Sequence, residues 1–197
     1  MRATVLCISL TLLYVTHAGA TDVQKDFDLN RFLGAWHGVA FATNSDWFLG
    51  KIKCAPCLAQ LNLTADGNIE LTRSNTWPQN SPTSVTTYTV TSVPGVFHAR
   101  KLNDGYQTEF RVVETDYDAY AMTMAYMTVA DWKFTLVKLM SRTQDITSDL
   151  VDKFEDYALQ KGLTKDNIVF SPRKEGVCNP DANAMNVTKE SSEEQKS

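Results

Sequence analysis

Eight short segments of alternating apolar and polar residues constrain the fold of this chain more than any other feature. In a strand, such alternation places every second side chain on the same face. Turns such as Asp66-Gly67 and Asp104-Gly105 separate the segments, and Asp-Gly between alternating segments is a strong hairpin signal. The predicted strands are residues 34–43, 56–64, 68–76, 84–91, 95–101, 106–116, 119–128 and 133–141. This succession predicts an all-β protein, either an up-and-down antiparallel barrel or a sandwich, and eight strands suffice to enclose one small ligand.

One amphipathic helix is expected after these strands, packed outside the sheet. It begins at residue 145 or 147 and ends at Lys161, before the capping residue Gly162. Its apolar face consists of Ile146, Leu150, Val151, Phe154, Tyr157 and Ala158. A short further strand is predicted at residues 167–170, and the lead-in before the first strand carries Phe27 and Leu29, which could close one end of a barrel.

The first 20 residues predict a secretory signal peptide. Arg2 precedes an apolar segment at residues 3–15, and Ala18-Gly19-Ala20 is a small-residue cleavage pattern. The alternative is a membrane anchor, but the apolar segment is shorter than the roughly 20 residues of a membrane span. We therefore expect a secreted, extracellular protein with one domain at residues 21–178 and a disordered tail at residues 179–197.

The charge and the histidines exclude several kinds of partner and chemistry. The formal net charge is −4 and basic clusters are lacking, which argues against nucleic acid as a partner. No later segment is apolar enough to predict a membrane span, and the sequence leaves a protein partner unknown. His37 and His98 lack the spacing of metal ligands, so neither a metal site nor a cofactor is predicted.

Trp36 is too large for a thin sheet to cover, so it needs a closed space and a flat partner. Arg142 is the candidate partner, because a guanidinium stacked on an indole is worth about 0.5–2 kcal/mol. If Arg142 reaches inward beneath Trp36, alternation along the same strand turns Lys138 and Met140 inward as well. Val137 and Leu139 then face outward, where the helix would cover them.

A glycosylation sequon, Asn62-Leu63-Thr64, fixes the direction of the second strand. A glycan on Asn62 must point away from a packed interior, so Cys57, Ala59, Leu61 and Leu63 face inward. Asn186 belongs to a second sequon, on the predicted tail. The residues predicted to contact a ligand are Trp47, Leu61, Leu71, Arg73, Tyr88, Phe110, Val112, Phe134, Leu136, Lys138 and Met140.

Two features of the predicted interior allow two interpretations each. Arg73 and Lys138 either meet the carboxylate of a ligand or lie at the mouth and reach water along their stems. Trp47 and Phe48 fall in a predicted loop, residues 44–51, and either form a lid over something apolar or pack on the rim.

Three separated motifs carry a resemblance to a known family. Gly34-Ala35-Trp36, Thr115-Asp116-Tyr117 and Ser141-Arg142 resemble, in this order, the three signature regions of the lipocalins. Residues 41–47, 112–118, 141–144 and 167–172 are most similar to the lipocalin-type prostaglandin D synthase subgroup. The resemblance implies an eight-stranded up-and-down antiparallel barrel (a calyx) with one C-terminal helix packed outside. It also implies structural roles for Gly34, Trp36, Thr115, Asp116, Tyr117 and Arg142.

The subgroup contains an isomerase that attacks a prostaglandin endoperoxide with a cysteine thiolate, and that cysteine corresponds to Cys57 here. The hydroxyl residues around the thiol do not carry over, because their positions correspond to Gly38, Ala59 and Arg73, and an inner tyrosine corresponds to Met140. A thiol in apolar surroundings stays protonated and unreactive. Arg73 would offset this if it lay close enough to lower the pKa of the thiol.

Three cysteines follow the predicted signal peptide, so at least one thiol is free or bonded to another molecule. Lipocalins usually tie the tail cysteine to one near the fourth strand, which has none here. We favour Cys54–Cys178 with Cys57 free, because Cys54 shares the outward alternation of Asn62. A Cys54–Cys57 bond within one strand would span roughly 10 Å, too far for a disulfide. A Cys57–Cys178 bond would abolish thiol chemistry.

Three functions follow as hypotheses. The first is a secreted carrier of a small hydrophobic ligand with a carboxylate, such as a fatty acid, retinoid or prostanoid. The second is a prostaglandin-H2 D-isomerase with Cys57 as nucleophile. The third is an interaction module whose barrel stays empty or narrow and whose outer rim, free thiol or tail binds another protein.

Overall fold

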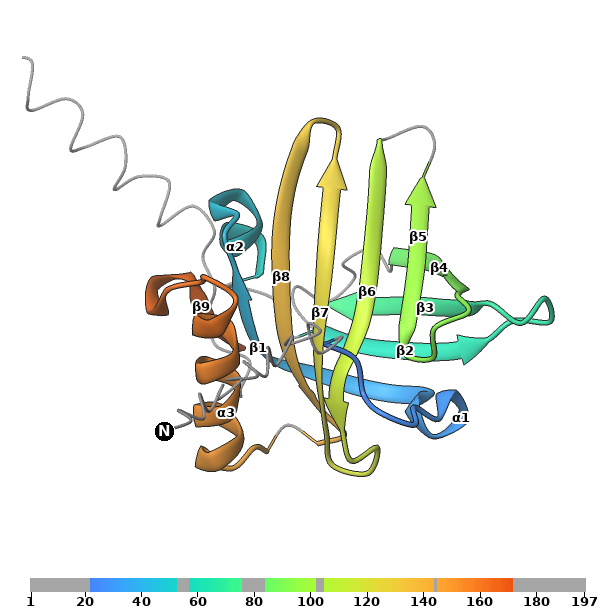
Figure 1. The fold of residues 1–197 in the computed structure, drawn as a ribbon, viewed down its shortest axis with the longest axis horizontal. Coiled ribbons are helices and arrows are strands. Elements are labelled where there is room, and N and C mark those ends of the chain that lie inside the picture. The colour runs from blue at the N-terminus through green and yellow to red at the C-terminus, as the bar shows by residue number, and fades with distance from the viewer. Residues whose placement is uncertain (1–21, 53–56, 76–83, 102–104, 144, 172–197) are drawn as a thin grey trace, which may run out of the picture.

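The structure, a computed structural model, is a single antiparallel sheet that closes on itself (Figure 1). It describes residues 22–52, 57–75, 84–101, 105–143 and 145–171, with backbone only at residues 51, 52, 57, 75 and 101. The strands are β1 (Gly34–Thr43), β2 (Cys57–Leu63), β3 (Ile69–Asn75), β4 (Ser84–Val90), β5 (Val96–Lys101), β6 (Tyr106–Thr115), β7 (Tyr120–Val129), β8 (Trp132–Ser141) and β9 (Ile168–Phe170). The helices are α1 (Leu29–Phe32), α2 (Asp46–Ile52), α3 (Ser148–Gln160) and the 3₁₀ turn η1 (Lys165–Asn167).

Strand β1 closes the barrel because it pairs on both of its edges. Strands β2 to β8 follow one another as sequential neighbours, and β1 pairs with β8 along residues 37–43 and with β2 along residues 34–38. Its second half is released from β2 and pairs with β9 instead, through residues 40–42. The predicted fold class, an eight-stranded up-and-down barrel with one helix outside, is confirmed.

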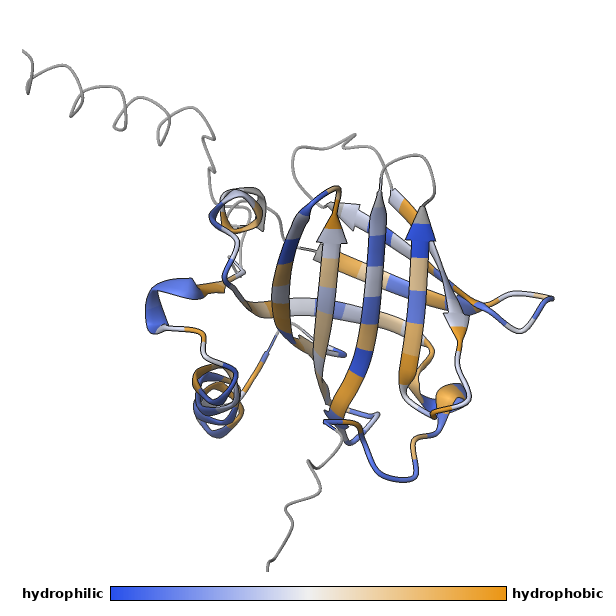
Figure 2. Cartoon of the chain, turned by 45° about the horizontal axis from the view of Figure 1, so that its top comes forward, coloured by the Kyte–Doolittle hydropathy of each residue, from blue (hydrophilic) through white to orange (hydrophobic). Residues whose placement is uncertain are grey.

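Helix α3 covers one outer face of the barrel. Thr147 caps its N-terminus by accepting a hydrogen bond from the Leu150 N–H. Phe154 and Ala158 are fully buried against outward-facing Val137 and Leu139 of β8. Along the strands at the front of Figure 2, hydrophobic and hydrophilic residues alternate, as a sheet with two different faces requires. The predicted outward direction of Val137 and Leu139 is therefore confirmed.

Strand β7 has apolar residues on both faces, so alternation by itself does not fix its direction. Ala121, Ala125 and Met127 join the core inside the barrel, whereas Met122 and Met124 join the outer core beneath α3. The position of α3 decides between the two faces, because the longer methionines fill the space under the helix.

One local prediction is wrong. Residues 44–51 are expected to form a loop, but Asp46 begins helix α2 there. Leu63 pairs with the core residue Ile69 of β3, so it lies on the inner face of the sheet, as predicted. It is nevertheless 48% exposed, because β1 starts opposite Leu61 and does not extend along β2 as far as Leu63.

The closed end of the barrel is organised around Arg142. Its guanidinium lies over the Trp36 ring, 3.7 Å from the centroid, which is the contact expected from the sequence. Its three nitrogens donate to the backbone carbonyls of Tyr117 (3.0 Å), Ala35 (2.8 Å) and Arg31 (2.8 Å). A single side chain thus ties the lead-in, β1 and the β6–β7 turn together.

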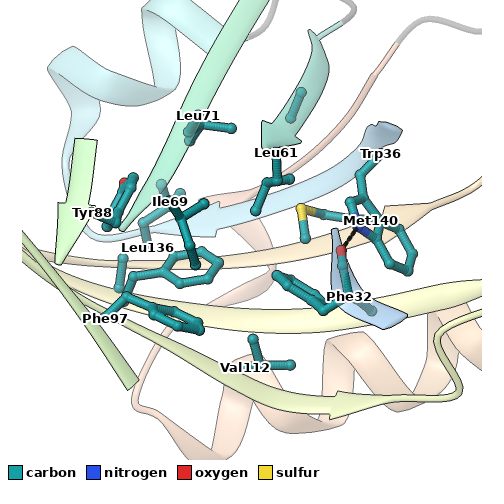
Figure 3. Packing of buried hydrophobic residues seen from close by; sticks show 14 of the residues in the cluster. Phe32, Trp36, Leu61, Ile69, Leu71, Tyr88, Phe97, Val112, Leu136 and Met140 are labelled. Carbon is teal, nitrogen blue, oxygen red and sulfur yellow. Dashed lines mark hydrogen bonds between the residues drawn. The ribbon is translucent and has the colours of Figure 1, made fainter. Parts of the chain in front are cut away.

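Aromatic rings fill the space above Arg142. Trp36 and Phe32 are fully buried, and the Trp36 indole N–H donates to the Phe32 carbonyl at 2.8 Å (Figure 3). Phe27 packs edge-on against Phe32 and Phe97, so the lead-in closes this end as predicted.

The turn between β6 and β7 is held by its own polar side chains. The Asp116 carboxylate accepts from the backbone N–H groups of Asp118, Ala119 and Tyr120, and the Thr115 hydroxyl accepts from the Tyr117 N–H at 2.8 Å. Tyr117 adopts a left-handed backbone with φ of 72°. Its hydroxyl accepts from the Asp28 N–H at 2.9 Å, which connects the turn to the start of α1.

Candidate functional site

Above the closed end, the barrel holds a cavity of about 230 Å³. Most of its wall is apolar, and Leu61, Leu71, Tyr88, Leu136 and Met140 converge on the interior in Figure 3. The lining residues are Gly38, Phe41, Phe48, Ala59, Leu61, Leu71, Arg73, Ser84, Tyr88, Thr108, Phe110, Ala125, Met127, Leu136, Lys138 and Met140.

Most residues predicted to contact a ligand lie in this wall, and three lie elsewhere. Val112 is fully buried in the core, close to the closed end. Phe134 packs its ring against Phe48, with centroids 5.4 Å apart, and of these two rings only that of Phe48 lines the cavity. Trp47 is 56% exposed and does not line the cavity. Helix α2 explains this, because consecutive residues of a helix point in different directions, so that Phe48 lines the cavity and Trp47 does not.

The sequence-based list misses several lining residues. Phe41 is absent from it because a bulge between Gly38 and Ala40 breaks the alternation of β1. Strict alternation from the inward-facing Trp36 and Gly38 would predict that Ala40 and Ala42 face inward. Both belong instead to the outer core, and Phe41 faces the hollow. Gly38 is the one signal in the sequence, since glycine marks bulges and close approaches within strands. The other omissions, Ala59, Ser84, Thr108, Ala125 and Met127, are inner positions of strands.

The polar groups of the cavity gather around an aromatic pair. The Arg73 guanidinium donates to the Tyr88 hydroxyl at 3.4 Å, and the Tyr88 and Phe110 rings lie 5.6 Å apart. On the other side of this pair, the Lys138 ammonium lies 5.6 Å from the Phe110 centroid. Two cations from β3 and β8 therefore reach one aromatic surface within the hollow.

Tyr88 remains a neutral phenol at physiological pH. Burial raises its pKa well above the ordinary value, because a phenolate would lose its hydration, and interaction with Tyr106 acts in the same direction. The positive charge of Arg73 opposes this shift without cancelling it. The site thus combines two cations with a protonated hydroxyl in apolar surroundings, which suits an anionic or hydrogen-bond-accepting group.

Cys57 is described only by its backbone. It is the first residue of β2, paired with Gly38 of β1 and Asn75 of β3, two positions before the cavity-lining Ala59. Its thiol lies outside the described part of the structure, as do Cys54 and Cys178 and therefore the predicted disulfide. The predicted signal peptide, the tail at residues 179–197 and the sequon residue Asn186 lie outside it as well.

Asn62 is exposed on the outer face of β2, where its side-chain oxygen accepts from the Gln60 amide at 3.2 Å. This leaves room for a glycan there.

The described ranges contain no cluster of three or more histidine, cysteine or acidic residues able to hold a metal ion. None of the helices within these ranges has the length and apolar composition needed to cross a membrane.

Comparison with known proteins gives one family. The model of the lipocalin / cytosolic fatty-acid binding protein family matches residues 33–175. A lipocalin from Rhinella marina is 32% identical over 175 residues, covering 88% of this chain and 96% of the relative. The prostaglandin-H2 D-isomerases of Equus caballus and Mus musculus are 33% and 29% identical, over 77% and 79% of this chain and 80% and 83% of theirs.

A solved structure, that of the siderocalin Ex-FABP, described as functioning through dual ligand specificities, is similar with a TM-score of 0.62. The match covers 73% of this chain and 95% of that one at 22% identity, and this likeness supports the fold alone.

Proposed function

This chain belongs to the lipocalin / cytosolic fatty-acid binding protein family, and from that premise we propose that it carries a small hydrophobic ligand with a carboxylate group inside its barrel. The observation that carries the proposal is the apolar hollow in which Arg73 and Lys138 approach the Tyr88–Phe110 pair. Both cations are partly buried beside this hollow, so the carboxylate of a ligand bound there would form charge-assisted contacts with them.

The size of the hollow supports modest affinity for a small ligand. Burying about 300 Å² of apolar ligand surface at about 25 cal/mol/Å² contributes about 7–8 kcal/mol before the cost of association. That cost is several kcal/mol, so apolar burial alone gives weak binding and the polar contacts decide the final affinity. Lys138 and Arg73 would supply this contribution by pairing with the carboxylate, while Tyr88 donates a hydrogen bond.

A titration with an acid and its ester tests the proposal. Calorimetry with dodecanoate and methyl dodecanoate should show the acid binding about tenfold more tightly, since only the acid carries a charge. Lys138→Met should remove this preference. Lys133→Met is the matched control, because it removes the same charge from an exposed position on the same strand and should leave both affinities unchanged. Equal binding of acid and ester by the wild-type protein would refute the proposal that the ligand carries a carboxylate group.

The proposal includes secretion, on the strength of residues 1–20 and their resemblance to a signal peptide. Expression in a eukaryotic cell line should release the protein into the medium with Thr21 as its first residue. Retention in the cell with Met1 intact would contradict it.

A second candidate function is prostaglandin-H2 D-isomerase activity with Cys57 as nucleophile. It is favoured by 33% identity to the Equus caballus isomerase and by the position of Cys57 in β2, two residues before the cavity-lining Ala59. It is opposed by Gly38, Ala59 and Met140, which leave these parts of the wall without hydroxyl groups. Turnover of prostaglandin H2 by the wild-type protein and by Cys57→Ala tests it, and equal rates would reject it.

A further inference from the structure

Phe41 places its ring inside the barrel, directly over Gly38. The ring lines the cavity and the residue is only 5% exposed. A Cβ atom added to Gly38 would lie 2.6 Å from the Phe41 Cζ, a separation that real Cβ atoms do not adopt. The absence of a side chain at residue 38 is therefore what allows the ring to lie there.

The backbone leaves Phe41 no other direction. The bulge between Gly38 and Ala40 reverses the alternation of β1, so Ala40 and Ala42 face the outer core beneath α3, where both are fully buried. Their neighbour Phe41 must then point into the barrel, where it stands opposite Lys138 of β8. Small residues on the outer side and a large one on the inner side agree with this direction, because α3 covers the outer side closely.

The ring occupies space that would otherwise belong to the ligand. The hollow of about 230 Å³ is smaller than the roughly 300–1,000 Å³ usual for small-molecule sites. Gly38 and Met140 pair across β1 and β8 and both line the cavity, so the ring fills the part of the hollow beside them.

We propose that Phe41, seated on Gly38, restricts the cavity to slender single-chain acids and excludes acids that end in a bulky ring. This inference rests on the proposed carrier function and narrows its ligand class, because it selects a fatty acid over a retinoid. Phe41 acts here as a specificity-determining residue, and Gly38 as the residue that positions it.

Paired titrations with dodecanoate and all-trans-retinoate test the inference. The wild-type protein should bind dodecanoate about tenfold more tightly than retinoate. Phe41→Ala should improve retinoate binding about tenfold and change dodecanoate binding by less than about threefold. Phe97→Ala is the matched control, since it removes an equally buried ring that does not line the cavity, and it should leave the ratio of the two affinities unchanged.

Gly38→Ala gives the opposite perturbation. The new methyl group pushes the ring further into the hollow, so dodecanoate binding should weaken about tenfold. Adding Phe41→Ala to Gly38→Ala should restore it, because no ring is left to be displaced. Thermal melts of each variant show which of them are folded, and Phe41→Leu, which shortens the side chain without emptying the site, replaces Phe41→Ala if the latter does not fold.

The outcomes separate this inference from the function on which it depends. If the wild-type protein and the Phe41 variants bind neither acid, the carrier function fails. If the wild-type protein binds retinoate as tightly as dodecanoate, the carrier function stands and the restriction by Phe41 is refuted. Failure of Phe41→Ala to rescue Gly38→Ala would refute the seating of the ring on Gly38.

Discussion

The two ends of the barrel are built from the same strands but are packed for different purposes. At the closed end, Trp36 and Phe32 are fully buried and Arg142 donates to three backbone carbonyls. At the other end, the same strands surround a hollow into which Arg73 and Lys138 project. At the closed end Arg142 bonds to the backbone, whereas at the other end Arg73 and Lys138 border a cavity.

This difference shows how a single sheet can be stable and still bind a ligand. A cavity forgoes packing contacts and lowers stability. The contacts at the closed end must therefore compensate for the packing that is missing around the hollow. Substitutions at the closed end should therefore lower the free energy of unfolding, whereas those in the hollow should mainly change binding.

The largest expected effect is that of Arg142→Ala. It removes three charge-assisted hydrogen bonds and the stacking on Trp36, and it leaves the Tyr117, Ala35 and Arg31 carbonyls without this donor. Because these contacts are not additive, we expect a loss of about 3–4 kcal/mol in the free energy of unfolding, measured by urea denaturation.

Arg31→Ala is the control for this prediction. Arg31 also lies over an aromatic ring, that of Tyr117 at 4.4 Å, and pairs with Asp118 at 3.1 Å, but its side chain is half exposed. Its removal should cost less than about 1 kcal/mol. Equal losses for the two arginines would mean that the closed end does not depend on Arg142.

A smaller effect is expected from Gly34→Ala. Gly34 has φ of 96°, which side-chain-bearing residues rarely adopt, and an added Cβ would lie 3.3 Å from Arg142 Nη1. We expect a loss of about 1–2 kcal/mol, seen as a lower thermal midpoint.

Gly50→Ala separates backbone strain from a general effect of alanine. Nothing lies within 4 Å of a Cβ added to Gly50, which is in helix α2, so this change should be neutral or stabilising by up to about 1 kcal/mol. If Gly34→Ala is equally harmless, the expectation that an added methyl group strains the backbone and crowds Arg142 is refuted.

Thr123→Val should raise stability instead of lowering it. Thr123 is fully buried between Val112 and Lys138, and its hydroxyl has no hydrogen-bond partner in the described part of the chain. Valine keeps the shape and removes the unsatisfied group, so we expect a gain of about 1 kcal/mol in the unfolding free energy. A loss of similar size would indicate that a buried water or another group satisfies this hydroxyl.

The smallest effect concerns the ion pair that links α3 to β6. Burial alone would raise the pKa of Glu114, but hydrogen bonds from Lys153 and Tyr120 hold it below the ordinary value. A lowered pKa stabilises the fold above the pKa of the unfolded chain, and this contribution is lost as the pH falls through the folded-state pKa. Because the groups are partly exposed, Glu114→Gln should cost less than about 1 kcal/mol at pH 7.

Denaturation of the wild-type protein and Glu114→Gln at pH 7 and at pH 3 checks this dependence. The difference between the two proteins should shrink at pH 3, and a difference that persists there would assign the effect to packing instead of charge.

Local pattern determines most of the barrel but not the direction of every side chain. Ile69, Leu71 and Arg73 alternate without interruption, so their inward direction follows from the sequence. Phe41 and Phe48 do not follow from it, because a bulge in β1 and the short helix α2 change the direction of the chain. The inward direction of both side chains depends on which faces the neighbouring elements cover. The two-residue alternation of a strand carries no information about this.

The sequence by itself determined the number of strands, the antiparallel order, the single outer helix and the contact between Trp36 and Arg142. These follow from alternation, turn residues and the need of one large ring for a flat partner, all of which act over short stretches or on a single pair. Only the tertiary structure decided which residues line the hollow and how large it is. Phe41 turns inward because β8 and β9 pair with β1 near the bulge in β1, and because α3 covers the neighbouring residues Ala40 and Ala42 on the outer face.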